Sequence, residues 1–149
     1  MTTEQIIEKL PFSHPYLFVD DLEYVSVKGA KGSFTYKEDL EFFKGHFNGY
    51  PVVPGAILIE TMGQIGGTCL GLFLSSLKEG KDENEVNEAY FATSYNADFY
   101  KPVYPNEKVI VTSELIYIRF GKLKYNVSMT DINGDLICKG VLSGMSRKL

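Results

Sequence analysis

The stretch that most constrains the fold is residues 52–77, VVPGAILIETMGQIGGTCLGLFLSSL, which is apolar almost throughout. Its length approaches the ~20 apolar residues that a membrane-spanning helix needs. Glu60 and Gln64 interrupt it, however, and a carboxylate at bilayer depth costs about 2.5–3.5 kcal/mol. A helix from Gly55 to about Leu77 that is enclosed by protein explains the same composition. We therefore expect a buried central helix and no membrane span.

The expected helix contains five glycines between positions 55 and 71. Each glycine costs about 1 kcal/mol relative to alanine in a helix interior. Close approach of another backbone is the usual reason for such glycines. A second copy of the same helix across a two-fold axis would supply that backbone.

Most of the remaining chain alternates apolar and polar residues with the period of β-strands. The pattern predicts strands at 17–27, 31–37, 89–100, 108–119, 122–131 and 135–146. Asn133-Gly134 predicts a tight hairpin with positive φ at both turn positions, and Gly121 is expected to turn the preceding strand pair. One long helix among about six mostly antiparallel strands predicts an α+β fold, a strongly curved sheet wrapped around that helix. No linker suggests a second domain, so residues 1–149 are expected to form one.

The ends of this pattern are also readable. Thr2 and Gln5 have capping-box spacing, which predicts a short opening helix that Pro11 ends. The charged segment 78–88 is expected to be a solvated connection.

The composition excludes several function classes. The net charge is −4 and the chain has no Lys/Arg run, so nucleic-acid and anionic-membrane binding are not expected. Cys69 and Cys138 lie far apart in apolar surroundings, which favours two buried thiols over a disulfide. The opening residues MTTEQIIEKL lack a signal-peptide layout, so a cytoplasmic protein is expected. No phosphate-binding glycine loop and no closely spaced Cys/His ligand set is present, so neither a cofactor nor a metal is expected.

The segment GHFNGYPVVPGAILIE, residues 45–60, contains two residues of chemical interest, His46 and Glu60. Glu60 has apolar neighbours in the helix, which favours burial. A buried carboxyl without a cation stays protonated and can donate a proton near neutral pH. Gln64, one turn on, either orients this carboxyl or only packs the helix.

Gly55 begins the helix after Pro54, so its N–H is a first-turn donor that suits a carbonyl oxygen gaining negative charge. A stiff helix start is the alternative reason for Pro54-Gly55, and a surface or structural role is the alternative for His46. Taken together, His46 as base, Glu60 as acid and Gly55 as oxyanion donor suit one reaction. They would remove a proton beside a carbonyl while a hydroxyl leaves the next carbon.

The same segment resembles a known family. The pattern F-x-G-H-F-x-G-x-P-V-x-P-G-x-x-x-x-E-x-x-x-Q begins at Phe43 and ends at Gln64, and every fixed position is met. It is similar to the β-hydroxyacyl-[acyl carrier protein] dehydratases of type II fatty-acid synthesis, which have the hot-dog fold. The segments LPFSHPYLFVD and ADFYKPVYPNE extend the resemblance over nearly the whole chain.

The resemblance implies a role for each residue. His46 would take the C2 proton of a 3-hydroxyacyl thioester, and Glu60 would protonate the departing C3 hydroxyl to give a trans-2-enoyl product. Gly55 N–H would hold the thioester oxygen, and Gln64 would support Glu60. A glutamate at position 60 looks like the branch that only dehydrates and does not isomerise the double bond.

The resemblance also implies partners. In the family, the histidine and the carboxylate of one site come from different protomers, so a homodimer is expected, possibly in a trimer of dimers. The acyl chain would lie in an apolar tunnel between two central helices. The acidic acyl carrier protein needs a basic dock, for which the candidates are Lys101, Arg119, Lys122 and Lys124.

Some positions depart from the family or stay open. Asn48 stands where proline is common, and Phe12 where a histidine usually stands; His14, two residues later, is expected to make a structural hydrogen bond. The residues Tyr90, Tyr95, Tyr100 and Tyr104 would line or gate the tunnel, or serve the core. Alternatives to a dehydratase are a hot-dog acyl thioesterase and a non-catalytic acyl-thioester-binding protein. The acyl chain, whether an ordinary fatty acid or a specialised polyene or pigment chain, cannot be chosen from the sequence.

Overall fold

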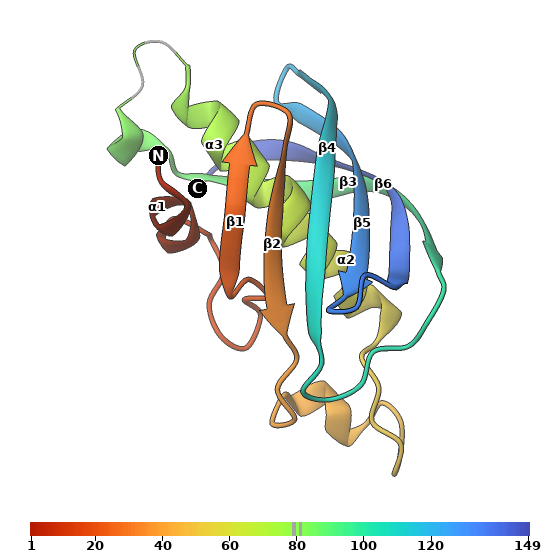
Figure 1. Ribbon diagram of the computed structural model, residues 1–149. Helices are drawn as coiled ribbons and strands as arrows, with labels where there is room; N and C mark the ends of the chain where they lie inside the picture. Colours follow the sequence, from red (N-terminus) through yellow and green to blue (C-terminus); the bar gives the residue numbers. More distant parts are fainter. Residues whose placement is uncertain (79, 81) are drawn as a thin grey trace.

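The computed structural model describes residues 1–78, 80 and 82–149. Six strands form one antiparallel sheet in the order β1-β2-β4-β5-β6-β3, and the sheet curves around a central helix (Figure 1). The strands are β1 (Asp21–Ser26), β2 (Gly29–Thr35), β3 (Glu88–Phe99), β4 (Lys108–Arg119), β5 (Lys122–Asp131) and β6 (Leu136–Lys148). The predicted α+β architecture is confirmed.

The central helix runs without a break through α2 (Gly55–Gly63), the π-helical turn η2 (Gln64–Thr68) and α3 (Cys69–Ser76). Gly55–Ser76 is long and apolar enough to cross a membrane by length and composition, yet 67% of its apolar window is buried inside the protein. The core helix of a soluble protein meets the same criteria. Met62, Ile65 and Leu70 have no exposed surface, because the sheet covers them. The predicted burial of this helix is confirmed.

The helix glycines have a different cause from the expected one. A Cβ atom on Gly67 would lie 2.2 Å from Tyr125 Oη, and one on Gly71 would lie 2.3 Å from Tyr90 Cζ. A Cβ on Gly66 would lie 3.0 Å from Cβ of Ser113. These glycines therefore make room for side chains of the sheet in the same chain. The expectation that a second helix requires them is wrong at these positions.

The opening segment follows its predicted pattern up to β1. In α1 (Thr3–Glu8), Thr2 Oγ1 accepts from Gln5 N at 3.2 Å and Gln5 Oε1 accepts from Thr2 N at 2.7 Å, which confirms the capping box. The strand predicted from residue 17 begins only at Asp21, because backbone groups at residues 16 and 18 bond a helix side chain instead.

The connection predicted at 78–88 is only partly solvated. Residues 79 and 81 lie outside the described residues. The 3-10 turn η3 (Glu83–Glu85) occupies its middle, and Val86 is buried. A second 3-10 turn, η1 (Glu41–Lys44), precedes the loop that contains His46.

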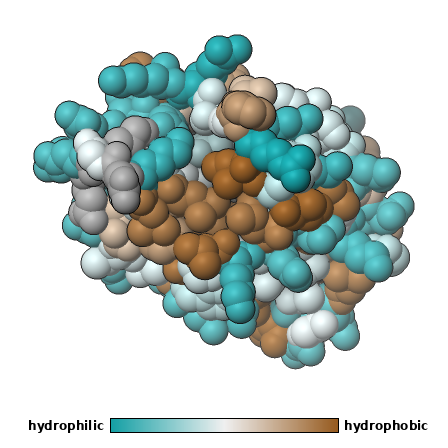
Figure 2. Space-filling model, turned by 90° about the horizontal axis from the view of Figure 1, so that it is seen from above, coloured by the Kyte–Doolittle hydropathy of each residue, from teal (hydrophilic) through white to brown (hydrophobic). Residues whose placement is uncertain are grey.

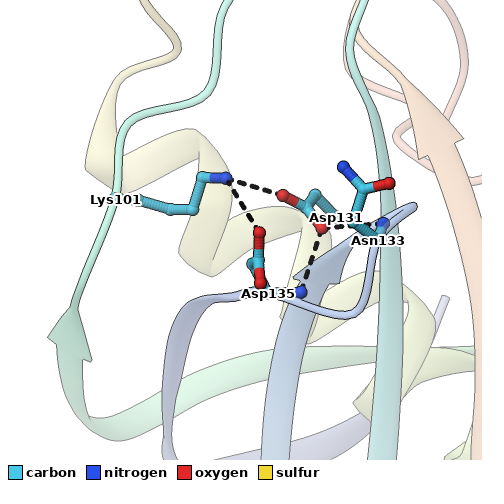
Figure 3. A network of polar contacts seen from close by, with 4 residues as sticks. All are labelled: Lys101, Asp131, Asn133 and Asp135. Carbon is cyan, nitrogen blue, oxygen red and sulfur yellow. Dashed lines mark hydrogen bonds and ion pairs between the residues drawn. The ribbon is translucent and has the colours of Figure 1, made fainter.

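The β5–β6 hairpin differs from its prediction. Gly134 has a φ of +85°, whereas Asn133 has a negative φ. Asp131 Oδ1 accepts from Asn133 N at 2.9 Å and from Asp135 N at 3.0 Å (Figure 3). The loop is therefore a three-residue connection with one left-handed glycine, and the prediction of two positive φ angles is wrong. The β4–β5 turn at Phe120 and Gly121 has both φ angles positive, which confirms the turn at Gly121.

Two features of the rest of the chain concern its chemistry and surface. Cys69 and Cys138 are both free and buried, as expected, and burial raises the pKa of the Cys138 thiol to about 12.

A band of apolar surface crosses the end of the molecule that Figure 2 shows. In Figure 1, α3, the β1–β2 turn and the β4–β5 turn reach this end, opposite the loop that follows η1.

Candidate active site

His46 lies in the loop between η1 and α2, where three hydrogen bonds hold it. Its N–H donates to Phe42 O at 2.9 Å, and its own carbonyl accepts from Val52 N at 2.9 Å. The ring Nδ1 lies 2.8 Å from Val52 O. A carbonyl oxygen can only accept, so Nδ1 carries the hydrogen and the neutral ring has its lone pair on Nε2. The loop thus presents His46 Nε2 as a proton acceptor.

Glu60 lies on the helix face that turns toward β3, and it lines a cavity of about 220 Å³. The side chain is half-buried, so the expectation of a buried Glu60 is wrong for the single chain. The helix face is open here because Gly63 and Gly67, which also line the cavity, carry no side chains. The carboxylate is thus accessible to a molecule in the cavity.

Gln64 is 1% exposed and uses its whole amide group. Its Oε1 accepts from Phe18 N at 2.8 Å, and its Nε2 donates to Tyr16 O at 2.9 Å and to Glu60 Oε1 at 3.0 Å. The expected contact between Gln64 and Glu60 is present. Because its other partners are backbone groups of the opening segment, the amide holds the Glu60 carboxylate in one orientation.

Gly55 is the first residue of α2. Ile57 N and Leu58 N both donate to Pro54 O, at 2.9 and 3.1 Å, so the N–H of Gly55 precedes the helical hydrogen-bond ladder. Gly55 lines a second cleft with Phe99, Tyr100 and four further residues, Val53, Leu58, Lys101 and Pro102. This cleft is separate from the Glu60 cavity.

Within one chain, therefore, the predicted site residues form two groups. Glu60 and Gln64 are joined by a hydrogen bond. Neither His46 nor Gly55 is among the residues that line the Glu60 cavity. The described chain brings the acid and its supporting amide together, and it does not bring the histidine to them.

The cavity follows the helix from Ala56 to Thr68, about 18 Å at 1.5 Å per residue. Residues of β3, β5 and β6 close its other sides. Tyr90 and Tyr95 line it, as one reading of the tyrosine-rich stretch predicted. Tyr100 instead lines the Gly55 cleft, and the hydroxyl of Tyr104 lies 2.9 Å from that of Tyr50.

Sequence reasoning missed Tyr125 and Thr68, which also line the cavity. The signal for Tyr125 was present, since Leu123, Tyr125 and Val127 alternate along β5 with the period that places side chains on one face. Tyr125 carries the hydroxyl on this otherwise apolar face, and that hydroxyl could have indicated a cavity beside the strand.

The four candidate basic residues do not form one patch. Lys101 Nζ lies 2.6 Å from Asp131 Oδ2 and 4.0 Å from Asp135 Oδ2 (Figure 3). Asp131 is the last residue of β5 and Lys122 the first, so the two ends lie about 30 Å apart at ~3.3 Å per residue.

The other basic residues stay close together at the far end of β5. Arg119 and Lys124 lie over the ring of Tyr117, at 5.1 and 6.0 Å, and Arg119 pairs with Lys122 across β4 and β5. The prediction of one patch of four is therefore wrong, because the Asp131 and Asp135 carboxylates pair with Lys101. The hydrogen bond predicted for His14 is not found among the described residues; its side chain lines a surface cleft with Asp20 and Asp39.

Comparison with known proteins identifies the family of this chain. The model of the FabA-like domain matches residues 10–141. The chain belongs to the FabA-like family. This FabA-like chain is 32% identical to the 3-hydroxyacyl-[acyl-carrier-protein] dehydratase FabZ of Bacillus subtilis, over 93% of each chain. It is 33% identical to the enzyme of the same name from Caldicellulosiruptor bescii, over 93% of this chain and 94% of that one. The predicted family is thus confirmed.

Solved structures agree on the fold of this FabA-like chain. The dehydratase heterocomplex ApeI:P from Xenorhabdus doucetiae matches with a TM-score of 0.76 and 15% identity, over 99% of this chain and 93% of that one. A thioesterase from Pseudomonas aeruginosa matches with a TM-score of 0.65 and 14% identity, over 100% and 96%. At such identities the likeness concerns the fold alone, and the predicted hot-dog fold is confirmed.

Proposed function

We propose that this protein is a hydro-lyase that converts a 3-hydroxyacyl-[acyl carrier protein] to the trans-2-enoyl-[acyl carrier protein] in fatty-acid or related chain synthesis. The family and the names of its relatives support this activity. The observation that carries the chemistry is the Glu60 carboxylate, which Gln64 orients on the wall of a cavity lined largely by apolar and aromatic side chains. An acyl chain in that cavity would place its reacting carbons within reach of a carboxyl acid.

His46, Glu60 and Gly55 each have one role in the reaction. His46 Nε2 takes the proton from C2, and the electrons of that C–H bond form the C2–C3 double bond. The C3–O bond breaks, Glu60 gives its proton to the departing oxygen, and water leaves. Acid–base assistance of this kind contributes typically 10²–10⁴-fold. Gly55 N–H, at the positive end of the helix, stabilises the thioester oxygen while it carries negative charge.

A homodimer is the proposed active unit, either alone or within a trimer of dimers. Two observations support it. Within the described residues, no histidine lines the Glu60 cavity. Among the strands that the structure describes, the edge strand β3 pairs with β6 alone, and it exposes Phe91, Tyr95 and Phe99, at 57%, 61% and 48%. A long edge strand with exposed aromatic residues tends to pair with another chain unless something covers it. A second copy paired along β3 would cover it and supply both His46 and Gly55, neither of which lines the Glu60 cavity of its own chain.

We propose that residues 1–149 act as one catalytic domain, that the protein works in the cytoplasm, and that it binds the acyl carrier protein. The chemistry proposed here needs no metal and no organic cofactor.

One experiment distinguishes this proposal from the alternatives. The protein is incubated separately with a 3-hydroxyacyl and a 2-enoyl thioester of pantetheine. Reversible interconversion of the two supports the dehydratase; release of free thiol would indicate a thioesterase, and binding without reaction would indicate a non-catalytic protein. Glu60→Gln should lose the interconversion. Glu41→Gln, which changes an exposed carboxylate outside the cavity, is the control and should keep it.

A further inference from the structure

Tyr125 is fixed inside the cavity by the helix glycines. The residue is 4% exposed, and its ring lies against Gly67, where a Cβ atom would collide with it, while a Cβ on Gly66 would lie 3.4 Å from the ring. The hydroxyl oxygen is the atom nearest to the missing Cβ of Gly67, at 2.2 Å, so it packs against the helix as well as lining the cavity. Packing does not, however, use its capacity to donate and accept hydrogen bonds.

That hydroxyl has no hydrogen-bond partner among the described residues. Tyr36, which is equally buried, bonds Thr61 Oγ1 at 2.6 Å. Because Tyr125 lines the cavity, a molecule bound there can supply the hydrogen-bond partner that the described residues do not. Burial raises the pKa of Tyr125, so the group stays protonated and able to donate. It is a donor and acceptor facing a cavity.

A second hydroxyl lies beside it. Thr68 is 3% exposed, follows Gly67 directly and lines the same cavity. Its hydroxyl also makes no hydrogen bond within the described part of the chain. Thr61, about two turns earlier in the helix, donates to Ile57 O at 2.8 Å. The cavity wall beyond Glu60 thus presents two hydroxyls with unused hydrogen-bonding capacity.

We infer that Tyr125 and Thr68 form a polar subsite that accepts an acyl chain with an additional oxygen atom, a hydroxyl or a carbonyl, some distance beyond C3. This inference rests on the proposed function, which places C3 at Glu60. Tyr125 Oη lies between the levels of Gly63 and Gly67, about 5–10 Å along the helix axis from Glu60. An extended chain advances about 1.2 Å per bond, as three bonds span ~3.3–3.6 Å in an extended peptide. The oxygen would then stand roughly four to eight bonds beyond C3.

The test compares two thioesters of equal length, 3-hydroxydecanoyl-pantetheine and 3,9-dihydroxydecanoyl-pantetheine. A hydrogen bond gained inside the cavity should raise kcat/KM for the dihydroxy chain by about tenfold over the plain chain. In Tyr125→Phe the ratio should fall to about one. Tyr36→Phe is the matched control, because it removes an equally buried phenol hydroxyl outside the cavity, and it should keep the wild-type ratio.

The outcomes separate this inference from the proposed function. A ratio near one in the wild-type protein, or an equal preference in wild type and Tyr125→Phe, overturns the subsite while dehydration itself stands. Should neither thioester react, the proposed function fails, and calorimetric binding of the two chains decides the subsite alone. Tighter binding of the dihydroxy chain that is lost in Tyr125→Phe supports it, and equal binding rejects it.

Discussion

Gln64 shows most clearly how a single residue serves both the fold and the site, because one amide bonds two backbone groups and a carboxylate. In Gln64→Ala, the buried N–H of Phe18 and the carbonyl of Tyr16 lose their partner. We expect the free energy of unfolding to fall by about 1–3 kcal/mol, measured as a shift of the urea midpoint. Gln5→Ala, which removes only the exposed capping-box bond from Thr2 N, should cost less, and an equal loss in both variants would contradict the role of Gln64.

The reacting groups make a second prediction at this scale. His46→Ala and Glu60→Gln should each abolish dehydration of a 3-hydroxyacyl thioester, by at least about 10²-fold, while circular dichroism stays unchanged. Glutamine at position 60 retains an oxygen for the Gln64 amide to bond and loses only the acidic proton. Near-normal turnover in either variant would remove that residue from the mechanism.

Asp131 predicts a dependence of stability on pH. The hydrogen bond from Lys101 is the main cause that lowers the pKa of the Asp131 carboxyl, and the N–H groups of Asp135 and Asn133 add to it. A lowered pKa in the folded state means that the ionised carboxylate stabilises the fold above the ordinary value of 3.8, and that this contribution is lost as the pH falls through the lower folded value. Asp131→Asn should therefore be less stable than wild type at pH 7, and the difference should shrink below about pH 4. Thermal denaturation at both pH values measures it, and a difference that is constant with pH would argue against this pairing.

Single residues also show what the sequence could predict. The contact of Glu60 with Gln64 follows from their spacing of four in a helix. The contact of Lys101 with Asp131 and the unpartnered hydroxyl of Tyr125 depend on residues many positions away. No local pattern contains that information.

Among the elements, the central helix gives the sharpest prediction. Gly67→Ala would place a methyl group within 2.2–2.8 Å of the Tyr125 ring and hydroxyl. Overpacking of this kind costs about 1–3 kcal/mol. At Gly63 the nearest atom to an added Cβ is 3.9 Å away, so Gly63→Ala should be neutral or gain up to about 1 kcal/mol of helix propensity. Urea denaturation of both variants measures the contrast, and equal stabilities would contradict the packing of Tyr125 against Gly67.

Element positions were largely predictable, and their ends were not. Period-two alternation placed all six strands and the apolar run placed the helix. The β5–β6 loop deviated because the Asp131 side chain bonds Asn133 N and Asp135 N, which favours a three-residue loop over a two-residue one. The start of β1 moved because the Gln64 amide binds the chain ahead of it. In both places a backbone N–H donates to a side chain, whereas the predicted strand or turn has it donate to a backbone carbonyl.

For the whole molecule, the proposed dimer is tested by mixing two inactive variants. Co-refolded His46→Ala and Glu60→Gln should form mixed dimers in which one of the two sites has an intact His46 and an intact Glu60. With random pairing, about a quarter of the wild-type activity should return. Each variant refolded alone is the control. Mixtures that stay inactive, although light scattering shows dimers, would place both residues of a site in one chain.

The interior of the fold thus followed from the sequence, while the proposed site takes its histidine from a second chain. Hydrophobic periodicity reports which face of an element is buried, and it does so for residues such as Met62 and Ile65. It does not report which chain supplies the histidine opposite Glu60.

The bonds of Gln64 have a consequence for how the protein can be switched off. The amide that aims the acid is anchored to residues 16 and 18, ahead of β1, and none of the six strands depends on that anchor for its pairing. A protease that removed the first twenty residues would leave the carboxylate without the amide orientation that Tyr16 and Phe18 fix, and would also remove the core residues Ile6, Leu10, Phe18 and Val19. Such a clipped protein would lose turnover and stability together.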